Sequence, residues 1–315
     1  MPVAASAARD TGPAARPGCI VTPDRHLWQS RAMDRLPNLR HFRGRSVALL
    51  TKHGKAGVIA PALAALDLTV VHTEDFDTDT LGTFSGEVER TLSPLECART
   101  KAKLACTLTG LEIGLGSEGS FGGGPMPGLL NWDSELLVLH HAGMNYEIVA
   151  AAAGPVRLAP VNIASLDALE QSFSGSDPGQ GWILRAGQRV IKGLEGAPAI
   201  AARLRALSQV DRAGRLINPV TIEPDLRAMH CPQRRAYIRQ AAEQLAARLQ
   251  SGCPACDAPD FWPDATEPGL PCADCGAPTR LPLAHVRRCR VCRHTVREPA
   301  AHPFADPGKC DWCNP

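Results

Sequence analysis

Apolar and polar positions along the first part of the chain follow the periods of alternating strands and helices. A short apolar run at 46–51 and a β-branched run at 68–72 predict two strands, and helical apolar spacing predicts a helix at 55–66 between them. Pro61 lies inside this helix and is expected to kink it. A strand–helix–strand unit of this kind places its two strands in parallel.

The next helix has a clear start signal. The Ser93 hydroxyl can accept a hydrogen bond from a backbone N–H of the first turn, and Pro94 fits the first helical position. Glu96 completes a capping box. The helical pattern continues to about Leu108, and Gly110 follows as a stop signal. We therefore predict a helix over these residues.

Strand-like and helix-like segments continue to alternate up to residue 249. The predicted strands are 111–115, 135–140, 146–151, 182–185, 189–192 and 219–222. The predicted helices are 165–173, 198–209 and 234–249. This alternation predicts an α/β fold with a mixed, mainly parallel sheet flanked by helices.

Composition divides the chain into three parts. Residues 1–41 are rich in Ala, Arg and Pro and show little periodicity, which predicts a disordered tail. We expect the α/β domain over 42–250 and a small zinc-ribbon-like module over 251–315. Met33 lies just before the first regular segment, so either the native chain starts there or residues 1–32 are dispensable.

Charge and hydropathy narrow the classes of partner. The net charge of +2 gives no overall field that would attract nucleic acid or a membrane surface. No apolar run reaches the ~20 residues needed to span a bilayer, and no apolar stretch of signal-peptide length lies near the N-terminus. Four scattered cysteines are typical of free thiols, namely Cys19, Cys97, Cys106 and Cys231. We expect a cytoplasmic protein and leave its oligomeric state open.

Four Cys-x-x-Cys pairs lie in the last 63 residues, and they carry the strongest chemical signal in the chain. The pairs are Cys253/Cys256, Cys272/Cys275, Cys289/Cys292 and Cys310/Cys313. Two such pairs complete a tetrahedral shell of four thiolates, so the eight cysteines predict two structural zinc ions. Disulfides suit a secreted domain, and iron–sulfur clusters usually follow other spacings.

The pairing of these knuckles is less clear from spacing. The three spacers have 15, 13 and 17 residues, and the shortest, Gly276–Arg288, suits a hairpin. This favours Cys272, Cys275, Cys289 and Cys292 on one metal and the two outer pairs on the other. A crossed pairing stays open.

A polar loop follows the first predicted strand and opens the first helix. It contains Thr51, Lys52, His53 and Lys55. Ligands of open α/β sheets bind beyond the carboxyl ends of strands, and helix N-termini with lysines suit phosphate. The chain has only 6 lysines against 28 arginines, so two in one loop favour a phosphate-binding role over an ordinary solvated loop.

Acidic residues follow the second and third predicted strands. Asp75, Asp77 and Asp79 alternate in one loop, and Glu118 lies among small residues in the next. Carboxylate oxygens suit Mg²⁺, and Glu118 could hold a metal or act as a general base. The plain alternatives are a charged surface turn and a flexible turn.

Two further cations are candidates for the same edge of the sheet. Lys101 lies on the capped helix, and Arg227 follows the last predicted strand. Their plain alternatives are a solvated helix face for Lys101 and a structural ion pair with Asp225 for Arg227.

The motifs together resemble a bacterial family classed as a domain of unknown function with a zinc-ribbon-like tail. The resemblance covers residues 42–315 and rests on Thr-Lys-His-Gly-Lys, Ser-Glu-Gly-Ser-Phe-Gly, Asp-Leu-Arg-Ala-Met and Cys-x-x-Cys-Asn-Pro. This chain has 122–125 as Gly-Gly-Gly-Pro where members have Gly-Pro-His-Pro, which weakens a metal site on that loop. It also has Pro224 and Leu226 in place of Thr and Met.

The order of the candidate residues is also similar to the inosine triphosphate pyrophosphatase-like enzymes. That resemblance implies that Lys55 holds phosphate, Lys101 faces a triphosphate and Glu118 helps to hold Mg²⁺. The spacing between the motifs differs, and the paired acids of those enzymes are only partly present.

These observations lead to one functional hypothesis and one alternative. We predict a Mg²⁺-dependent hydrolase of a phosphorylated small molecule, nucleotides included, with catalytic Glu118, Asp77 and Asp79. The predicted substrate ligands are Thr51, Lys52, His53, Lys55, Lys101 and Arg227.

The alternative is a non-enzymatic zinc-ribbon protein that binds nucleic acid or a protein partner. The window His285–Arg297 holds five arginines, two histidines and no acid. However, each four-thiolate zinc site carries a formal charge of about −2, which nearby arginines would neutralise. We therefore favour the hydrolase.

Overall fold

The computed structural model describes residues 38–81, 92–122, 124–125, 131–173, 175–218 and 220–315, without the side chains of residues 39, 79 and 81. The predicted disorder of residues 1–37 lies outside this description. Residues 38–41, which the sequence assigns to the tail, are part of the fold. Asn38 is buried, and a 3-10 helix, η1 (Leu39–His41), leads into the first strand.

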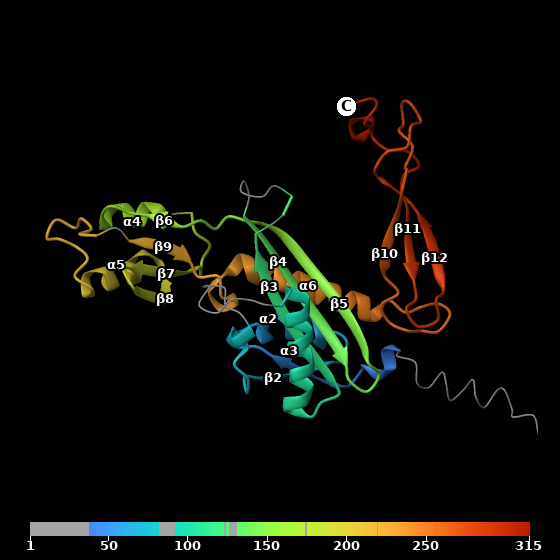
Figure 1. Cartoon of the computed structure of the whole chain (residues 1–315), viewed down its shortest axis with the longest axis horizontal. Helices are drawn as coiled ribbons and strands as arrows, with labels where there is room; N and C mark the ends of the chain where they lie inside the picture. The colour runs from blue at the N-terminus through green and yellow to red at the C-terminus, as the bar shows by residue number, and fades with distance from the viewer. Residues whose placement is uncertain (1–37, 82–91, 123, 126–130, 174, 219) are drawn as a thin grey trace, which may run out of the picture. The chain divides into compact units, whose positions relative to one another are not determined.

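A five-stranded mixed sheet forms the centre of the α/β domain (Figure 1). Its strands are β1 (Ser46–Leu50), β2 (Thr69–Thr73), β3 (Ile113–Phe121), β4 (Asn131–His141) and β5 (Tyr146–Val156). Their order is β2-β1-β3-β4-β5. β1 pairs in parallel with β2 and β3, whereas β3–β4 and β4–β5 are antiparallel. A mixed sheet is thus confirmed and a mainly parallel one is not, because a short turn rather than a crossover helix joins β4 to β5.

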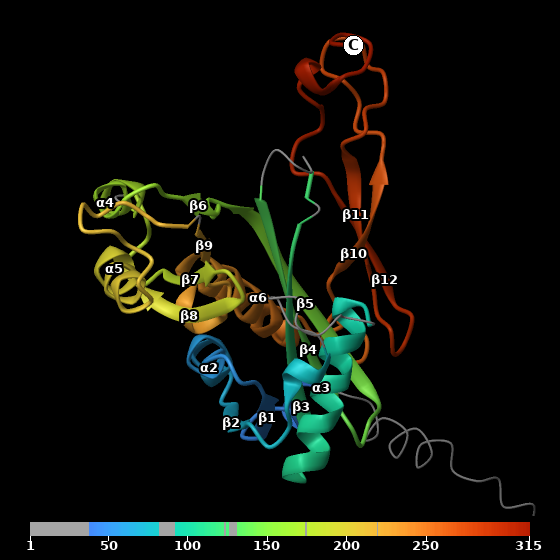
Figure 2. The ribbon, with the colours of Figure 1, turned by 60° about the vertical axis from the view of Figure 1, so that its left-hand side comes forward.

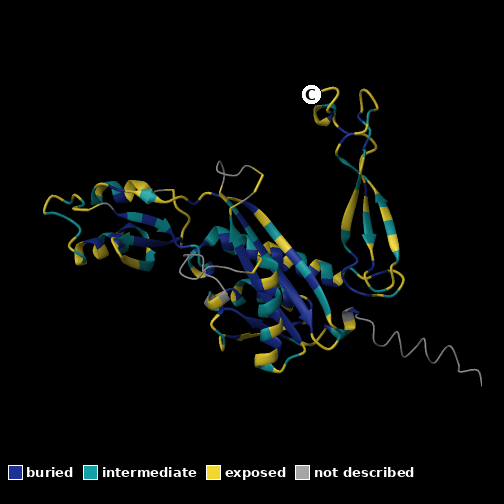
Figure 3. Cartoon of the chain, in the orientation of Figure 1, coloured by how far each residue is buried: buried dark blue, intermediate teal, exposed yellow. Residues whose placement is uncertain are grey.

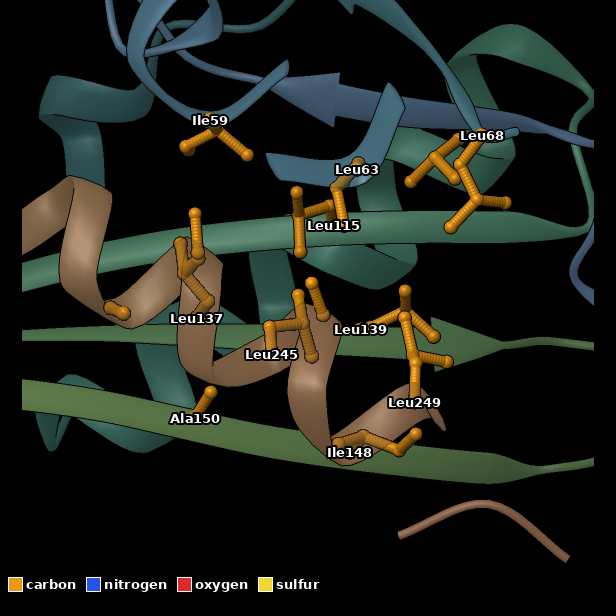
Figure 4. Packing of buried hydrophobic residues seen from close by; sticks show 14 of the residues in the cluster. Ile59, Leu63, Leu68, Leu115, Leu137, Leu139, Ile148, Ala150, Leu245 and Leu249 are labelled. Atoms are coloured by element: carbon orange, nitrogen blue, oxygen red, sulfur yellow. The ribbon is translucent and has the colours of Figure 1, made fainter. Parts of the chain in front are cut away.

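Helices cover both faces of this sheet, as Figure 2 shows. α2 (Ala56–Ala64) and α6 (Pro232–Gln250) pack on one face, and α3 (Pro94–Thr109) packs on the other. In Figure 4, leucines of β3 and β4 and Ile148 of β5 face Leu245 and Leu249 of α6. This apolar layer is the main core of the chain.

The helix α3 begins and ends as its sequence predicts. The Ser93 side chain accepts from the Glu96 N–H, and Glu96 accepts from the Ser93 N–H at 2.9 Å. Gly110 has φ 72° and closes the helix in the left-handed conformation. A Cβ at Gly116 of β3 would lie 1.8 Å from the Ala98 carbonyl oxygen, so only glycine lets the helix approach the strand this closely.

β3 is longer than the sequence predicts. The predicted loop from Ser117 onwards continues as strand to Phe121 and pairs residue by residue with β4. Its glycines permit close packing of helix and strand rather than a turn. As a result, Glu118 lies on a central strand and is buried.

A second lobe, residues 161–224, has a sheet and a core of its own. Its strands are β6 (Val161–Asn162), β7 (Gly181–Ala186), β8 (Arg189–Glu195) and β9 (Thr221–Pro224), and its helices are α4 (Leu166–Phe173) and α5 (Gly196–Ala206). The sheet is antiparallel with the order β6-β9-β7-β8, and its core includes Leu169, Leu184 and Ile200. The sequence predicts most of these elements but assigns them to a single α/β domain.

The C-terminal module is a thin three-stranded antiparallel ribbon. Its strands are β10 (Pro263–Pro268), β11 (Pro282–Arg288) and β12 (Thr295–Pro299). Figure 3 shows that most of its strand residues are exposed or half-buried, unlike those of the central sheet. Such a ribbon buries little apolar surface, so its stability has to come from elsewhere.

Three short 3-10 helices complete the described elements: η2 (Thr78–Leu81), η3 (Ala228–His230) and η4 (Pro307–Lys309). Among the helices of the described residues, none combines the length and the apolar character that crossing a bilayer requires.

Candidate functional site

A pocket of about 350 Å³ lies where the ends of β1 and β3 meet residues of the second lobe. Six of the nine non-cysteine residues predicted for the site line it: Thr51, His53, Lys55, Lys101, Glu118 and Arg227. The structure thus brings together side chains that are far apart in the sequence. Thr51 and Arg227, for example, are separated by 176 positions. Lys52 and Asp77 do not line it, and the side chain of Asp79 lies outside the described part of the chain.

Lys55 is the most deeply placed cation of the predicted loop. It immediately precedes α2 and is only 4% exposed. Its Nζ donates to the Ser117 hydroxyl at 3.0 Å and lies 3.4 Å from a Glu135 carboxylate oxygen. Burial lowers the Lys55 pKa to about 8, against the opposing effect of the Glu135 charge. An ammonium with a pKa of about 8 can bind an anion and can also donate a proton near neutral pH.

Glu118 and Lys101 form a second buried pair in the pocket. The Lys101 Nζ donates to a Glu118 carboxylate oxygen at 2.5 Å, across the contact between α3 and β3. Lys101 therefore does not lie on a solvated helix face, and Glu118 does not lie in a flexible turn. The pair places a cation and an acid side by side where a ligand could contact both.

Sequence reasoning missed the charged residues beneath these two pairs. Arg234 of α6 is 1% exposed, forms an ion pair with buried Glu135 of β4, and donates to the Leu226 carbonyl oxygen at 2.6 Å. Arg234 and Glu135 are 99 positions apart, so no local motif joins them. Asp133 and Glu135 are two positions apart on one strand and hence share a face, which is the sequence signal that could have revealed them.

Asp133 is the most unusual acid of this region. Its side chain is fully buried, and neither carboxylate oxygen has a hydrogen-bond partner among the described residues. Burial raises its pKa to about 7, and the Glu135 charge adds to the rise, while Arg234 and Lys55 oppose it. Asp133 in turn contributes to the raised pKa values of Cys231 and Tyr237.

Asp133→Asn is expected to become progressively more stable than the native chain as pH rises from about 4 to about 7. In that window, folded Asp133 keeps a proton that the unfolded chain has released, so native stability falls with rising pH. The variant lacks this decline. The difference in free energy of unfolding between the variant and the native chain therefore grows by about 1.4 kcal/mol for each unit by which the folded Asp133 pKa exceeds the unfolded one. Urea unfolding at several pH values measures it, with Asp264→Asn as an exposed control. A stability difference that does not change with pH would contradict the raised pKa of Asp133.

Thr78 of the acidic loop lines the pocket, whereas Asp75 and Asp77 do not. Asp77 forms an exposed ion pair with Lys52 at 2.7 Å, and Asp75 accepts from the Thr73 hydroxyl at 2.8 Å. The Asp79 side chain lies outside the described residues. The described acids do not form a group with metal-binding geometry, because Asp77 is bound to Lys52 while Glu118 is bound to Lys101.

The second lobe and the segment that follows it contribute further charges to the pocket. Arg227 makes a bidentate ion pair with buried Asp225, with contacts of 3.0 and 2.6 Å, so the structural ion pair considered above is present. Arg227 nevertheless lines the pocket. Arg185 and Glu223 pair at 2.8 Å and also line it, although the sequence gives no sign of them as site residues.

The eight paired cysteines form two clusters that could each hold a metal ion. One contains Cys253, Cys256, Cys289 and Cys292, and the other contains Cys272, Cys275, Cys310 and Cys313. Four sulfur–sulfur distances between paired knuckles are 3.6 to 3.8 Å. Four sulfurs about 2.3 Å from a central zinc ion in a tetrahedron would be about 3.8 Å apart, so the clusters fit this metal.

The favoured knuckle pairing is wrong, and the crossed pairing is the one formed. The strand order of the ribbon explains this. The first knuckle precedes β10 and the third lies between β11 and β12, so both are at one end of the ribbon. The second knuckle lies between β10 and β11 and the fourth follows β12, at the other end. The lengths of the spacers do not show how the chain runs through β10, β11 and β12, so they cannot predict which knuckles meet.

The arginine-rich window is less basic in the structure than in the sequence. Arg287 pairs with Glu298 at 2.8 Å, and Arg297 pairs with Glu267 at 2.6 Å. Arg290 lies 3.5 Å from an Asp260 carboxylate oxygen. Acids outside the window therefore pair with two of its five arginines, and a third, Arg290, shares Asp260 with Arg248. These contacts reduce the support for a nucleic-acid surface there.

Comparison with known proteins identifies one family. The sequence model described as Domain of unknown function (DUF6671) matches residues 101–315, which include Lys101, Glu118, the second lobe and both cysteine clusters. No curated protein matches the chain. These comparisons give no support to a similarity with inosine triphosphate pyrophosphatase-like enzymes. Because the match covers more than half of the sequence, the chain belongs to the family described as Domain of unknown function (DUF6671).

Proposed function

We propose that the chain is a hydrolase that acts on a small phosphorylated molecule bound in this pocket. The observation that carries the proposal is the charge of the lining. Six cationic residues line the pocket, namely Lys55, Lys101, Arg185, Lys192, Arg227 and Arg234. Three acidic residues line it, namely Glu118, Glu223 and Asp225. Buried Glu135 contacts Lys55 and Arg234 from beneath the pocket and offsets one of the excess charges. The positive charge that remains favours an anionic ligand.

Lys55 and Lys101 are the proposed phosphate ligands. Lys55 lies between the end of β1 and α2, and Lys101, in the middle of α3, reaches Glu118 of β3. Ligands of α/β proteins bind beyond the carboxyl ends of such strands. Phosphate oxygens would compete with Glu118 for the Lys101 ammonium and with Ser117 for the Lys55 ammonium. The pocket volume lies within the range of about 300–1,000 Å³ that small-molecule sites occupy.

Glu118 is the proposed general base. Once phosphate takes over Lys101, the carboxylate can accept a proton from a water molecule that attacks phosphorus. The new bond joins the water oxygen to phosphorus, the phosphorus–oxygen bond to the leaving group breaks, and Lys55 donates a proton to the leaving oxygen. In protein sites, substrate phosphates are common ligands of Mg²⁺, and here they would hold the ion while Glu118 stays free to act as the base.

The two cysteine clusters are proposed as structural zinc sites. Each has four thiolates, which leaves no coordination position for a substrate, and this composition is typical of structural rather than catalytic zinc. We therefore place the chemistry in the pocket and a stabilising role in the module.

Glu118→Gln is expected to lower kcat for phosphate release about 10²- to 10⁴-fold, because it removes the proton acceptor. The assay incubates the purified full chain and Mg²⁺ with phosphomonoesters, diphosphates and triphosphates, and measures released phosphate. Glu112→Gln, which changes an exposed acid that does not line the pocket, should retain full activity. Equal turnover by Glu118→Gln, or no release above background from any compound, would remove the proposal.

A further inference from the structure

The pocket lining has a second chemical character besides its cations. Apolar side chains from the ends of β3 and β5, the following linker, β7 and the segment after β9 also line it: Phe121, Val156, Leu158, Ile183 and Leu226. Phe121, Val156, Leu158 and Leu226 pack together in one apolar cluster, and the side of this cluster that lines the pocket offers apolar surface to a ligand. A small, fully solvated sugar phosphate would not use this surface. Burial of apolar ligand surface against it adds about 25 cal/mol per Å², so it favours a ligand with an apolar face.

Polar groups are set among these apolar side chains. The Arg185–Glu223 ion pair belongs to β7 and β9, and the Asn131 amide donates to the Leu158 carbonyl oxygen. An aliphatic chain in contact with these groups would remove them from water without offering any hydrogen bond, which costs free energy. A flat ring whose edge carries donors and acceptors avoids this cost.

Phe121 offers a surface for such a ring. It lines the pocket at the end of β3, and the Arg234 guanidinium lies 5.9 Å from its ring centroid. An aromatic ligand ring can stack on a phenylalanine face or on a guanidinium plane. The apolar part of the lining thus combines a stacking partner with a cation and a carboxylate about 3 Å apart, Arg185 and Glu223.

We propose that the phosphorylated ligand is a nucleotide, an inference that rests on the function proposed above. Its phosphate contacts Lys55 and Lys101 of the α/β domain, and its base lies against Phe121 and Ile183 with its polar edge facing Arg185 and Glu223. Under this assignment the second lobe determines specificity, while the central sheet holds the reacting group.

Isothermal titration calorimetry on the full chain tests this assignment. The probes are the four common nucleoside 5′-monophosphates, ribose 5-phosphate, hexyl phosphate and inorganic phosphate. At least one nucleotide is expected to bind ten times more tightly than ribose 5-phosphate or hexyl phosphate. Ile183→Ala is expected to weaken that nucleotide about tenfold and ribose 5-phosphate less than twofold. Val190→Ala, at a 39% exposed position of the same lobe outside the pocket, is the matched control and should change neither.

The possible failures can be told apart. Equal binding of nucleotides and ribose 5-phosphate would overturn the nucleotide assignment and leave the phosphate site standing. Tighter binding of hexyl phosphate would overturn it in favour of an aliphatic phosphate. If no phosphorylated probe binds, the proposed function fails as well. Thermal melting of Ile183→Ala shows whether a loss of affinity comes from the pocket or from unfolding of the lobe.

Discussion

Replacing Cys253 and Cys289 together by serine is expected to remove one metal ion per chain and to leave the other in place. In the crossed pairing these two cysteines belong to the same cluster, so the second cluster keeps all four thiolates. Inductively coupled plasma mass spectrometry of the purified chain should find two zinc ions in the native protein and one in this variant. The complementary pair Cys272→Ser with Cys310→Ser should also leave one.

The combination of Cys272→Ser and Cys289→Ser separates the two pairings. These residues belong to different clusters, so both metal ions should be lost. In the pairing that spacer length favours, the same change would remove only one. A result of one ion for this variant and none for the Cys253/Cys289 variant would overturn the crossed arrangement.

Metal loss should have a large effect on the fold of the module. Structural zinc contributes about 10–16 kcal/mol of apparent binding free energy in zinc-finger peptides, and that energy stabilises the folded form. The ribbon has few buried residues to replace it. In the variant that carries both Cys272→Ser and Cys289→Ser and so loses both metal ions, amide protons of β10, β11 and β12 should exchange rapidly with solvent. Those of the central sheet should stay protected.

Arg234→Met is expected to lower the free energy of unfolding by about 3–5 kcal/mol, because it leaves the buried Glu135 carboxylate without its main counter-charge. Lys55, at 3.4 Å, compensates only in part. Urea unfolding followed by circular dichroism measures the loss. Arg239→Met, at an exposed position of the same helix, should stay within about 0.5 kcal/mol of the native chain.

The double variant Glu135→Leu with Arg234→Met provides the matching test. Removal of both charges eliminates the unpaired Glu135 carboxylate, so this variant should be more stable than Arg234→Met alone. Stability of Arg234→Met within about 1 kcal/mol of the native chain would show that the pair is not the buried bridge described here.

Local signals in the sequence predict local structure well. The capping box of α3, the first strand–helix–strand unit and the hairpin of β4 and β5 all lie close to their predicted positions. Each depends on residues near one another in sequence, where cap, turn and periodicity act directly. The same reasoning ended β3 too early, because Gly119, which leaves room for the Glu135 and Arg234 side chains, resembles a turn glycine.

Features that depend on distant residues could not be predicted in this way. The crossed cysteine clusters follow from the path of three strands, and the separate core of the second lobe follows from how its sheet folds on α4 and α5. Thr51, His53 and Lys55 meet Glu118 in the pocket because β1 and β3 are parallel neighbours. Lys101 reaches the pocket from the middle of α3, and Arg227 reaches it from the segment after β9 of the other sheet. The ion pair of Arg234 with Glu135, which joins α6 to β4, is not signalled by any local sequence pattern.

The chain of contacts beneath the pocket has a thermodynamic consequence. Lys55 contacts Glu135, Glu135 contacts Arg234, and Arg234 binds the Leu226 carbonyl oxygen in the segment between the second lobe and α6. An anion that draws Lys55 away from Glu135 therefore alters the interaction that anchors this connecting segment. By reciprocity, a perturbation that displaces the segment must change the affinity at Lys55 by the same factor.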